Sequence, residues 1–222
     1  MTSNKMTTKS MNTIISVEGN IGSGKSTLLQ NLSGLVDAIL VKEPVDVWST
    51  IMDKSGETML QKFYREPEKY AFPFQMMAFI SRLHLLKETC EQNPGRTIIT
   101  ERSLYTDKLV FAKMLFQQGK IEDVNYQIYL KWFDTFVTDF PISKLIYVNS
   151  DPEICHQRIS VRSREGEEGI PLEYLKNCQT YHESMFSEMA TTEILTLDGN
   201  VDIHENREQL DIWINQIKTF IQ

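Results

Sequence analysis

Residues 17–27 of the chain read Val17-Glu18-Gly19-Asn20-Ile21-Gly22-Ser23-Gly24-Lys25-Ser26-Thr27. An apolar run precedes this stretch and an apolar-periodic run follows it, which predicts a strand, a glycine-rich loop and a helix. The glycines let successive backbone N–H groups converge on one anion, and the start of the helix adds its positive dipole end. The spacing G-x-x-x-x-G-K-S also places a lysine to reach the β- and γ-phosphates of a nucleotide and a serine to bind the accompanying Mg²⁺. Residues 19–27 are therefore predicted to form a phosphate-binding loop.

Short apolar runs alternate with helical patterns along the rest of the chain. Strands are expected at residues 13–17, 38–41, 97–100, 145–148 and 194–197. Helices are expected from residue 25, in two short segments before residue 67, and at 73–90, 106–117, 122–140, 152–163, 171–189 and 205–221. This alternation is typical of a parallel sheet with helices on both faces, and no repeat or change of composition marks a second domain. We expect one α/β domain with a five-stranded parallel sheet at residues 13–222.

Three of the expected strands end in residues that can carry chemistry. The first strand runs into the phosphate-binding loop, the second is followed by Glu43, and the third by Glu101 and Arg102. Ligands of such sheets bind at the carboxyl ends of the strands, so these groups are expected to line one cleft.

Phosphoryl transfer needs a positioned nucleophile, a metal ion and cations around the phosphoryl group. We assign Glu43 as the general base for a hydroxyl, and Ser26 with Glu101 as the residues that hold Mg²⁺. Lys25 and Arg102 are the cations that stabilise charge on the transferring group. The alternative for both glutamates is a solvated acid at the end of a strand.

A group of arginines follows the fourth strand. Arg158 and Arg162 are one helical turn apart, and Arg164 begins a charged loop, so the three guanidinium groups could close over a polyphosphate like a lid. A solvated helix end with ion pairs is the alternative.

The helix expected after Pro73 has an unusual face. Gln75, Ala78, Phe79 and Arg82 follow helical spacing and project from one side. A buried glutamine and arginine need polar partners, and the two ends of a glutamine amide can pair with the edge of a nucleobase. Aromatic side chains for stacking on the base are at Trp48, Phe74 and Phe111. This face indicates a base pocket, with an amphipathic helix that has a solvated edge as the alternative.

The composition limits the class of partner. The 222 residues are 41% hydrophobic and 24% charged, with a formal net charge of −7, which argues against nucleic acid or an anionic membrane as the main partner. Three widely spaced cysteines without a C-x-x-C pattern fit a reducing compartment. Residues 1–12 are polar and read as a flexible tail, and a cytoplasmic location is favoured over a mitochondrial one because this segment is short and has no arginine.

Several motifs occur in a characteristic order. They are residues 18–27, Glu43-Pro44-Val45 with Trp48, Pro73-Phe74-Gln75, Glu101-Arg102-Ser103, the three arginines and Gly169-Ile170-Pro171-Leu172-Glu173-Tyr174-Leu175. Together they resemble the deoxyribonucleoside kinase family over nearly the whole chain, from Thr13 to the last helix. The resemblance implies a P-loop kinase fold with an arginine-rich lid. It also implies phosphorylation of a deoxyribonucleoside 5′-hydroxyl by ATP and Mg²⁺, in nucleotide salvage.

The resemblance also implies roles for single residues. Glu43 matches the base that deprotonates the 5′-hydroxyl, and Arg102 matches the arginine beside that oxygen. Further matches are Tyr64 and Glu167 for the sugar 3′-hydroxyl, Gln75 for base reading, Phe111 for base stacking, and Asp202 for the loop near the donor adenine. The family is dimeric through helices beside the nucleoside pocket, so a homodimer is expected. The apolar residues of helices 74–90 and 106–117 are candidates for that interface or for the core.

Three positions indicate which base is accepted. Ala78, Arg82 and Asp107 resemble the deoxycytidine and purine-nucleoside kinases, whereas thymidine-accepting members have Val, Met and Ala there. An ionised aspartate accepts a hydrogen bond from an exocyclic amine and repels the O4 atom of thymine. Deoxyadenosine, deoxyguanosine or deoxycytidine is therefore expected as the acceptor, with thymidine poor.

Two other functions are alternatives for a chain with a phosphate-binding loop. A thymidylate-kinase-like enzyme shares the phosphate-binding loop but accepts a monophosphate, and Glu43 argues against it because a second anion would be repelled there. A nucleotide-dependent switch is the second alternative, and it would leave the face with Gln75 and Arg82 unexplained.

Overall fold

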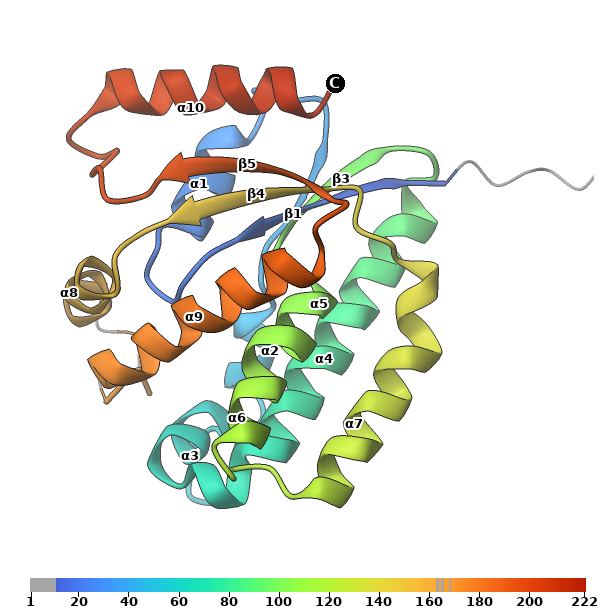
Figure 1. Ribbon diagram of the computed structural model, residues 1–222, viewed down its shortest axis with the longest axis vertical. Coiled ribbons are helices and arrows are strands. Elements are labelled where there is room, and N and C mark those ends of the chain that lie inside the picture. Colours follow the sequence, from blue (N-terminus) through green and yellow to red (C-terminus); the bar gives the residue numbers. More distant parts are fainter. Residues whose placement is uncertain (1–10, 163, 165, 168) are drawn as a thin grey trace, which may run out of the picture.

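The computed structural model describes residues 11–222 except 163, 165 and 168. Five strands in this part of the chain form one sheet: β1 (Thr13–Glu18), β2 (Ile39–Val41), β3 (Thr97–Glu101), β4 (Lys144–Asn149) and β5 (Glu193–Asp198). The strand order is β2-β3-β1-β4-β5, and all neighbouring pairs are parallel (Figure 1). The predicted α/β fold with a five-stranded parallel sheet is confirmed, and each strand agrees with the prediction to within one residue at either end.

The helical segments surround this sheet. They are α1 (Lys25–Leu32), α2 (Val45–Ser49), α3 (Met59–Arg65), α4 (Pro67–Gln92), α5 (Leu104–Thr106), η1 (Asp107–Ala112), α6 (Lys113–Gln117), α7 (Asp123–Phe136), η2 (Val137–Asp139), α8 (Pro152–Arg162), α9 (Leu172–Glu188) and α10 (Arg207–Phe220). Residues 1–10 of the expected tail lie outside the described residues. Asn12, which was assigned to that tail, donates hydrogen bonds to the carbonyl oxygens of Asn93 and Arg96.

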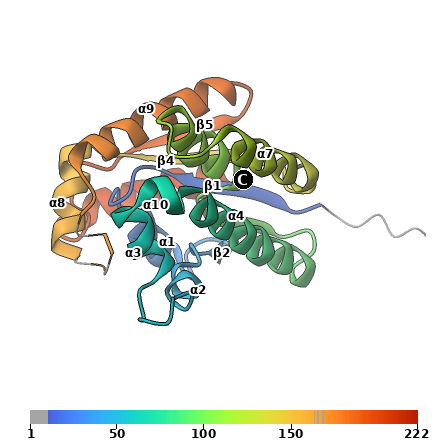
Figure 2. The ribbon, with the colours of Figure 1, turned by 90° about the horizontal axis from the view of Figure 1, so that it is seen from below.

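Consecutive residues of the central strands pack against opposite faces of the sheet, as pleating requires. Ile15 and Ile99 belong to one buried cluster with apolar residues of α1 and α10. Ile14 and Ile98 belong to another, with residues of α4 and α7. Helices therefore cover both faces, and Figures 1 and 2 show α1 and α7 on opposite sides of the strands.

Helix α4 is longer than predicted. It begins at Pro67, so Pro73, the expected start, lies inside the helix. A proline inside a helix lacks the N–H that would bond the carbonyl four residues earlier. Ala71 and Phe74, on either side of Pro73, are both buried, and their packing outweighs that single lost bond. The expected boundary at Pro73 was therefore wrong.

The segment from Leu104 to Gln117 also differs from a regular helix. Its middle part, η1, is a π-helix of six residues, in which the backbone N–H of residue i+5 donates to the carbonyl oxygen of residue i. Single π-helical turns are frequent at functional sites. Asp107 and Phe111, both in η1, line the cavity described below.

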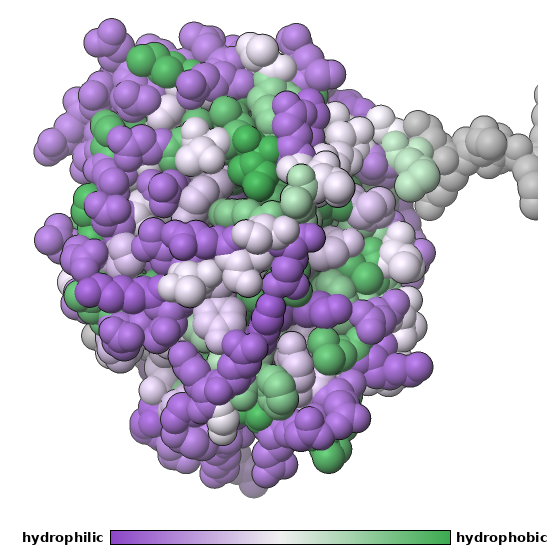
Figure 3. All heavy atoms as spheres, viewed as in Figure 1, coloured by the Kyte–Doolittle hydropathy of each residue, from purple (hydrophilic) through white to green (hydrophobic). Residues whose placement is uncertain are grey.

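Hydrophilic and hydrophobic side chains are intermixed on the face shown in Figure 3. None of the helices in the described part of the chain is both long enough and apolar enough to cross a membrane.

Candidate active site

A cavity of about 760 Å³ opens at the carboxyl ends of β1, β2 and β3. It joins the phosphate-binding loop to Glu43, Glu101 and Arg102, as the parallel sheet predicted. All other predicted site residues that line it come from the helices and loops around these ends: Trp48, Tyr64, Phe74, Gln75, Ala78, Arg82, Asp107, Phe111, Arg158, Arg162, Arg164, Glu167 and Asp202. Gly19, Asn20 and Phe79 of the predicted residues do not line the cavity.

Gly19 and Asn20 hold the loop instead of forming the cavity wall. A Cβ atom on Gly19 would lie 2.6 Å from the carbonyl oxygen of Val148, so the glycine lets the loop approach β4. The Asn20 side chain donates to the carbonyl oxygen of Leu175 at 2.8 Å. Both residues thus pack the loop against neighbouring segments, and their contact with phosphate stays a prediction.

Gly24 is the residue immediately before α1, and its φ of 100° is a conformation that favours glycine. No atom lies within 4 Å of the place where its Cβ would stand, so the backbone here is open to a ligand. Residues 21–27 line the cavity at this point. The loop therefore faces the cavity at the N-terminus of a helix, where anions are favoured.

Lys25 is folded over its own loop. Its Nζ donates to the carbonyl oxygen of Asn20 at 2.6 Å and lies 3.5 Å from the Ser23 Oγ. Burial, together with the charge of Arg102, lowers the pKa of Lys25 to about 7. An anion bound in the loop would favour the charged ammonium group.

Ser26 and Glu101 bring two oxygen donors together. The Ser26 Oγ donates to the Glu101 Oε1 at 2.6 Å, and the Glu43 backbone N–H points to the Glu101 Oε2 at 3.5 Å. The start of α1 is thus linked to the end of β3 and to the residue that follows β2.

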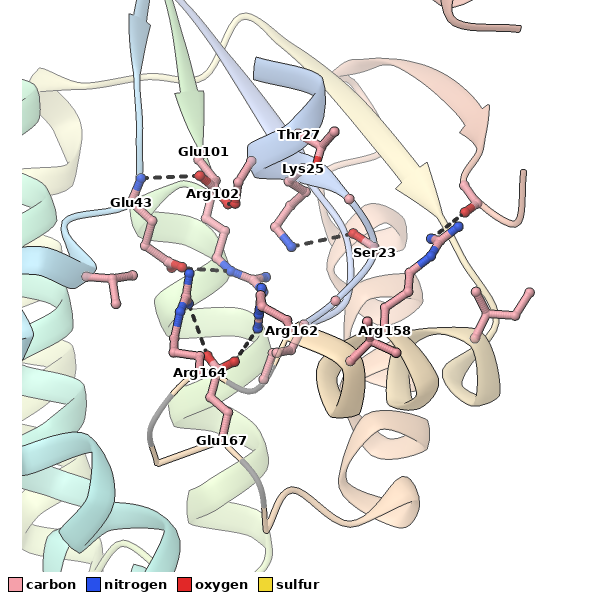
Figure 4. Close-up of a pocket in the computed structure, with 18 of the residues that line it drawn as sticks. Ser23, Lys25, Thr27, Glu43, Glu101, Arg102, Arg158, Arg162, Arg164 and Glu167 are labelled. Carbon is pink, nitrogen blue, oxygen red and sulfur yellow. Dashed lines mark hydrogen bonds and ion pairs between the residues drawn. The ribbon is translucent and has the colours of Figure 1, made fainter. Parts of the chain in front are cut away.

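The Glu43 carboxylate lies between two guanidinium groups. Its Oε1 accepts from the Arg82 Nη2 at 2.8 Å and lies 3.4 Å from the Arg102 Nε. Burial favours the neutral acid, but the charges of Arg102 and Arg82 prevail and lower the pKa of Glu43 to about 2. Glu43 is therefore an ionised acceptor on the cavity wall, facing the phosphate-binding loop (Figure 4).

Arg102 has an unusual backbone conformation. Its φ of 63° is the one positive value among the described residues other than glycine. The Arg102 Nη1 donates to the carbonyl oxygen of Gly19 at 2.8 Å, and the guanidinium lies 5.0 Å from the centre of the Phe111 ring. Arg102 is therefore held between the phosphate-binding loop and an aromatic side chain.

Arg82 also binds Asp107. Its Nε donates to the Asp107 Oδ2 at 2.9 Å, and its Nη1 donates to the carbonyl oxygen of Glu101 at 2.7 Å. Burial raises the pKa of Asp107 to about 6, against the opposing charge of Arg82. The hydrogen bonds from the Arg82 guanidinium favour the ionised form of Asp107, in which both carboxylate oxygens accept.

The side of the cavity formed by α4 is apolar apart from Gln75 and Arg82. The Gln75 Oε1 is buried and has no hydrogen-bond partner among the described residues. Phe74 stacks on Phe63 with ring centres 4.6 Å apart. Phe79 does not line the cavity: it is buried against Tyr129 and Phe133, so its expected place on the pocket face was wrong.

The arginines do not act as one group in this structure. Arg162 and Arg164 both bind the carboxylate of Glu167, as Figure 4 shows. Arg158 instead donates to the carbonyl oxygens of Gly199 and Val201, at 2.7 and 3.4 Å. All three arginines line the same cavity, and their closure over one polyphosphate stays a prediction.

The sequence interpretation missed several residues of the wall. Tyr174 lines the cavity and lies edge-on to Tyr64 with ring centres 6.2 Å apart. Phe63 and Ile203 also line it. Tyr174 belongs to the motif at residues 169–175, which could have indicated a place in the site. Nothing in the local sequence pattern separates Phe63 or Ile203 from core residues.

Comparisons with known proteins cover nearly the whole chain. The sequence profile of the family described as deoxynucleoside kinase matches residues 15–222. The chain is 32% identical to deoxycytidine kinase 1 of Xenopus laevis, over 93% of this chain and 89% of the relative. It is 33% identical to deoxycytidine kinase of Homo sapiens, over 93% and 90% of the two chains. It is 30% identical to mitochondrial thymidine kinase 2 of Macaca fascicularis, over 94% and 81%.

The family profile and these relatives extend over nearly the whole chain, and one cavity contains both the predicted phosphate-binding loop and the partly buried Glu43 carboxylate. The chain therefore belongs to the deoxynucleoside kinase family and is a phosphotransferase that phosphorylates deoxynucleosides with a nucleoside triphosphate as donor.

Proposed function

We propose that the enzyme transfers the γ-phosphoryl group of ATP to the 5′-hydroxyl of deoxycytidine, deoxyadenosine or deoxyguanosine, in preference to thymidine. The observation that carries this proposal is the position of the ionised Glu43 carboxylate, which shares one cavity with the phosphate-binding loop. A base for a hydroxyl is needed when the acceptor is a nucleoside, and a second phosphate beside Glu43 would be repelled.

In the proposed reaction, Glu43 accepts the proton of the 5′-hydroxyl and aligns its oxygen toward the phosphate-binding loop. Phosphoryl transfer needs little help from a strong base, so a carboxylate of low pKa is sufficient. Arg102, 3.4 Å from Glu43, stabilises negative charge on the group in transfer. Lys25 leaves the carbonyl oxygen of Asn20 to contact the phosphates.

Ser26 and Glu101 are the residues that would hold Mg²⁺. Their oxygen atoms already meet at 2.6 Å, and magnesium typically takes one or two protein oxygens and completes its shell with water and phosphate. The ion would neutralise charge on the β- and γ-phosphates.

Glu167 and Tyr64 are proposed to hold the sugar 3′-hydroxyl. Both line the cavity, and Glu167 is kept in place by Arg162 and Arg164. This gives the two arginines a positioning role on the nucleoside side while Arg158 remains at the donor side, beside Asp202 and the loop after β5.

The base preference follows from Arg82, Asp107 and Gln75. Asp107 offers acceptors that suit an exocyclic amine, and the unpaired Gln75 Oε1 offers another. Thymine presents a carbonyl oxygen where cytosine has its amine, and this oxygen would face the Asp107 carboxylate. The relatives include both deoxycytidine kinases and a thymidine kinase, so their names do not indicate which base this enzyme prefers. The proposed preference therefore rests on the side chains of Arg82, Asp107 and Gln75.

Incubation with ATP, Mg²⁺ and each of the four deoxynucleosides, with products identified by mass spectrometry, tests the proposal. We expect nucleoside 5′-monophosphates, with the lowest kcat/KM for thymidine. A diphosphate formed from thymidylate would indicate the thymidylate-kinase-like alternative, and loss of ATP without a phosphorylated nucleoside would indicate the switch. A thymidine kcat/KM equal to or above the others would refute the base preference.

We also propose that the enzyme is a homodimer that pairs through α7. Four apolar side chains spaced by four residues are exposed along this helix: Val124 (65%), Ile128 (41%), Trp132 (48%) and Phe136 (38%). Such a continuous apolar stripe is typical of a protein interface. The 106–117 segment was an expected candidate, but its large apolar residues, including Val110, Met114 and Leu115, are mainly buried in the core.

A cytoplasmic location remains the preferred proposal, and it rests on the three widely spaced cysteines, which fit a reducing compartment. Fractionation of expressing cells with an antibody to the protein tests it.

A further inference from the structure

Glu18, the last residue of β1, is fully buried and does not line the cavity. Its carboxylate accepts hydrogen bonds from three hydroxyl groups. The Ser16 and Ser103 Oγ atoms lie 2.5 and 2.8 Å from the Oε1, and the Thr106 Oγ1 lies 2.5 Å from the Oε2. A buried carboxylate with this many donors is fully paired, yet the reaction described above gives it no role.

Two of these hydroxyls belong to the turn after β3. Ser103 and Thr106 form a capping box, in which the Ser103 Oγ accepts from the Thr106 N–H and the Thr106 Oγ1 accepts from the Ser103 N–H. A hydroxyl has one proton to donate, and both point it to Glu18. The carboxylate therefore fastens the start of α5 to the end of β1.

Neighbouring bonds reinforce this junction. The Arg102 N–H donates to the carbonyl oxygen of Val17 at 2.9 Å, and the Arg102 Nη1 donates to that of Gly19 at 2.8 Å. Residues 17, 18 and 19 thus each accept a bond from the turn at residues 102–106. A left-handed backbone conformation is unfavourable for a residue other than glycine, so the surrounding contacts must hold Arg102 at its φ of 63°.

We propose that Glu18 is a positioning residue for phosphoryl transfer. Through Ser103 and Thr106, it fixes where the Arg102 guanidinium stands relative to the phosphate-binding loop. Asp107 directly follows Thr106, so the same junction also sets the start of η1. The inference rests on the proposed function, because Arg102 affects turnover only if it stabilises the transferring phosphoryl group.

The first test is Glu18→Gln, which keeps the shape but replaces one acceptor oxygen with an amide that donates. We expect kcat to fall between about 10- and 100-fold, because displacement of a catalytic group by about 1 Å has effects of this size. KM for the nucleoside and for ATP is expected to change less than about threefold, since Arg102 acts mainly in the transition state. Ser103→Ala and Thr106→Val should lower kcat in the same way, and they carry the test should Glu18→Gln not fold.

Ser16→Ala is the matched control. It removes a bond of similar length to the same carboxylate, but Ser16 lies within β1 and does not touch the turn at Arg102. We expect Ser16→Ala to lower Tm while kcat stays within about twofold of the wild type. If Glu18 serves only to satisfy a buried charge, Ser16→Ala and Ser103→Ala will lower kcat equally.

A second control uses the Arg102→Ala background. If Glu18 acts through Arg102, adding Glu18→Gln to Arg102→Ala lowers kcat by less than about twofold further. A full additional loss in that background would overturn the inference, and so would wild-type kcat in Glu18→Gln, Ser103→Ala and Thr106→Val. An active wild-type enzyme with either result leaves the proposed function intact, whereas a wild type inactive with all four deoxynucleosides would overturn both.

Discussion

Arg82 links two parts of the site through one side chain. Its guanidinium binds the carboxylates of Glu43 and Asp107 and the carbonyl oxygen of Glu101. The fork of N–H groups on arginine suits this arrangement, and lysine could not reproduce it. In the proposed function, Arg82 therefore couples reading of the nucleobase by Asp107 to the placement of Glu43.

Asp107→Asn is predicted to relax the selection against thymidine. The amide can donate a hydrogen bond to a carbonyl oxygen, which the aspartate cannot do. We expect the ratio of kcat/KM for thymidine to that for deoxycytidine to rise about tenfold, equivalent to about 1.4 kcal/mol. Asp134→Asn is the control, since Asp134 is an exposed partner of Lys108 on the surface. An unchanged ratio in Asp107→Asn would remove Asp107 from base selection.

Residue types and strand-end positions were predictable, but pairings were not. Glu43, Glu101 and Arg102 could be placed because parallel strands end on the same edge of a sheet. The Arg82–Glu43 contact joins residues 39 positions apart in sequence, and its geometry depends on how α4 packs. Phe79 was misplaced for the same reason: helical spacing puts it near Gln75, but packing turns it toward Tyr129.

At the scale of elements, α9 carries a buried histidine. The His182 Nδ1 contacts the carbonyl oxygen of Cys178 at 2.7 Å, and the Nε2 has no partner among the described residues. Burial, with the charge of Arg102, lowers the pKa of His182 to about 3, so the ring is neutral in the folded protein. Acid is therefore expected to destabilise the packing of α9, because protonation of His182 would place a charge in the core.

His182 is predicted to make folding pH-dependent. Below about pH 6.5 the unfolded chain binds a proton that the folded chain does not, so the free energy of unfolding falls by up to about 1.4 kcal/mol per pH unit. This loss continues until the pH approaches 3, the folded value. Urea unfolding at pH 7, 6 and 5 should show a smaller pH slope for His182→Phe than for the wild type. His84→Asn, at an exposed site, should leave the slope unchanged; equal slopes in all three proteins would contradict the assignment.

The sequence predicted which segments are strands or helices better than it predicted where a helix begins or where its winding changes. The strands followed from short apolar runs, but the start of α4 at Pro67 and the π-helical turn of η1 did not. A proline is a sound signal for a helix start in isolation, and here tertiary packing of Ala71 and Phe74 overrides it. No sequence period distinguishes a single wide turn from a regular helix, although this turn brings Asp107 and Phe111 to the cavity.

At the scale of the molecule, the sheet brings together groups that are far apart in the sequence. Residues from the first 30 positions to the loop after β5 line a single cavity. In the proposed function, the phosphate-binding loop and the segment after β5 form the donor side, and α2, α3, α4 and η1 form the nucleoside side. The chain has a net charge of −7, but six arginine and lysine side chains and only five carboxylates line this cavity.

The proposed dimer makes a prediction at this scale. Trp132→Lys places a charge in the middle of the exposed stripe of α7, so we expect a shift from dimer to monomer. Ile212→Lys is the control, because Ile212 is similarly exposed at 44% but lies on α10. Analytical ultracentrifugation of the three proteins at equal concentration measures the change. A wild-type monomer, or a Trp132→Lys dimer of unchanged stability, would contradict the interface.

The central claim is that Glu43 activates a deoxynucleoside hydroxyl beside phosphates held by the loop at residues 19–27. The most direct test is the kcat of Glu43→Gln, measured together with the Kd of its best deoxynucleoside by calorimetry. We predict that kcat falls at least about 100-fold while Kd stays within about threefold, because the amide keeps the shape but cannot take the proton. Glu57→Gln, outside the cavity, should retain wild-type kcat. A kcat for Glu43→Gln within about twofold of the wild type would contradict the claim.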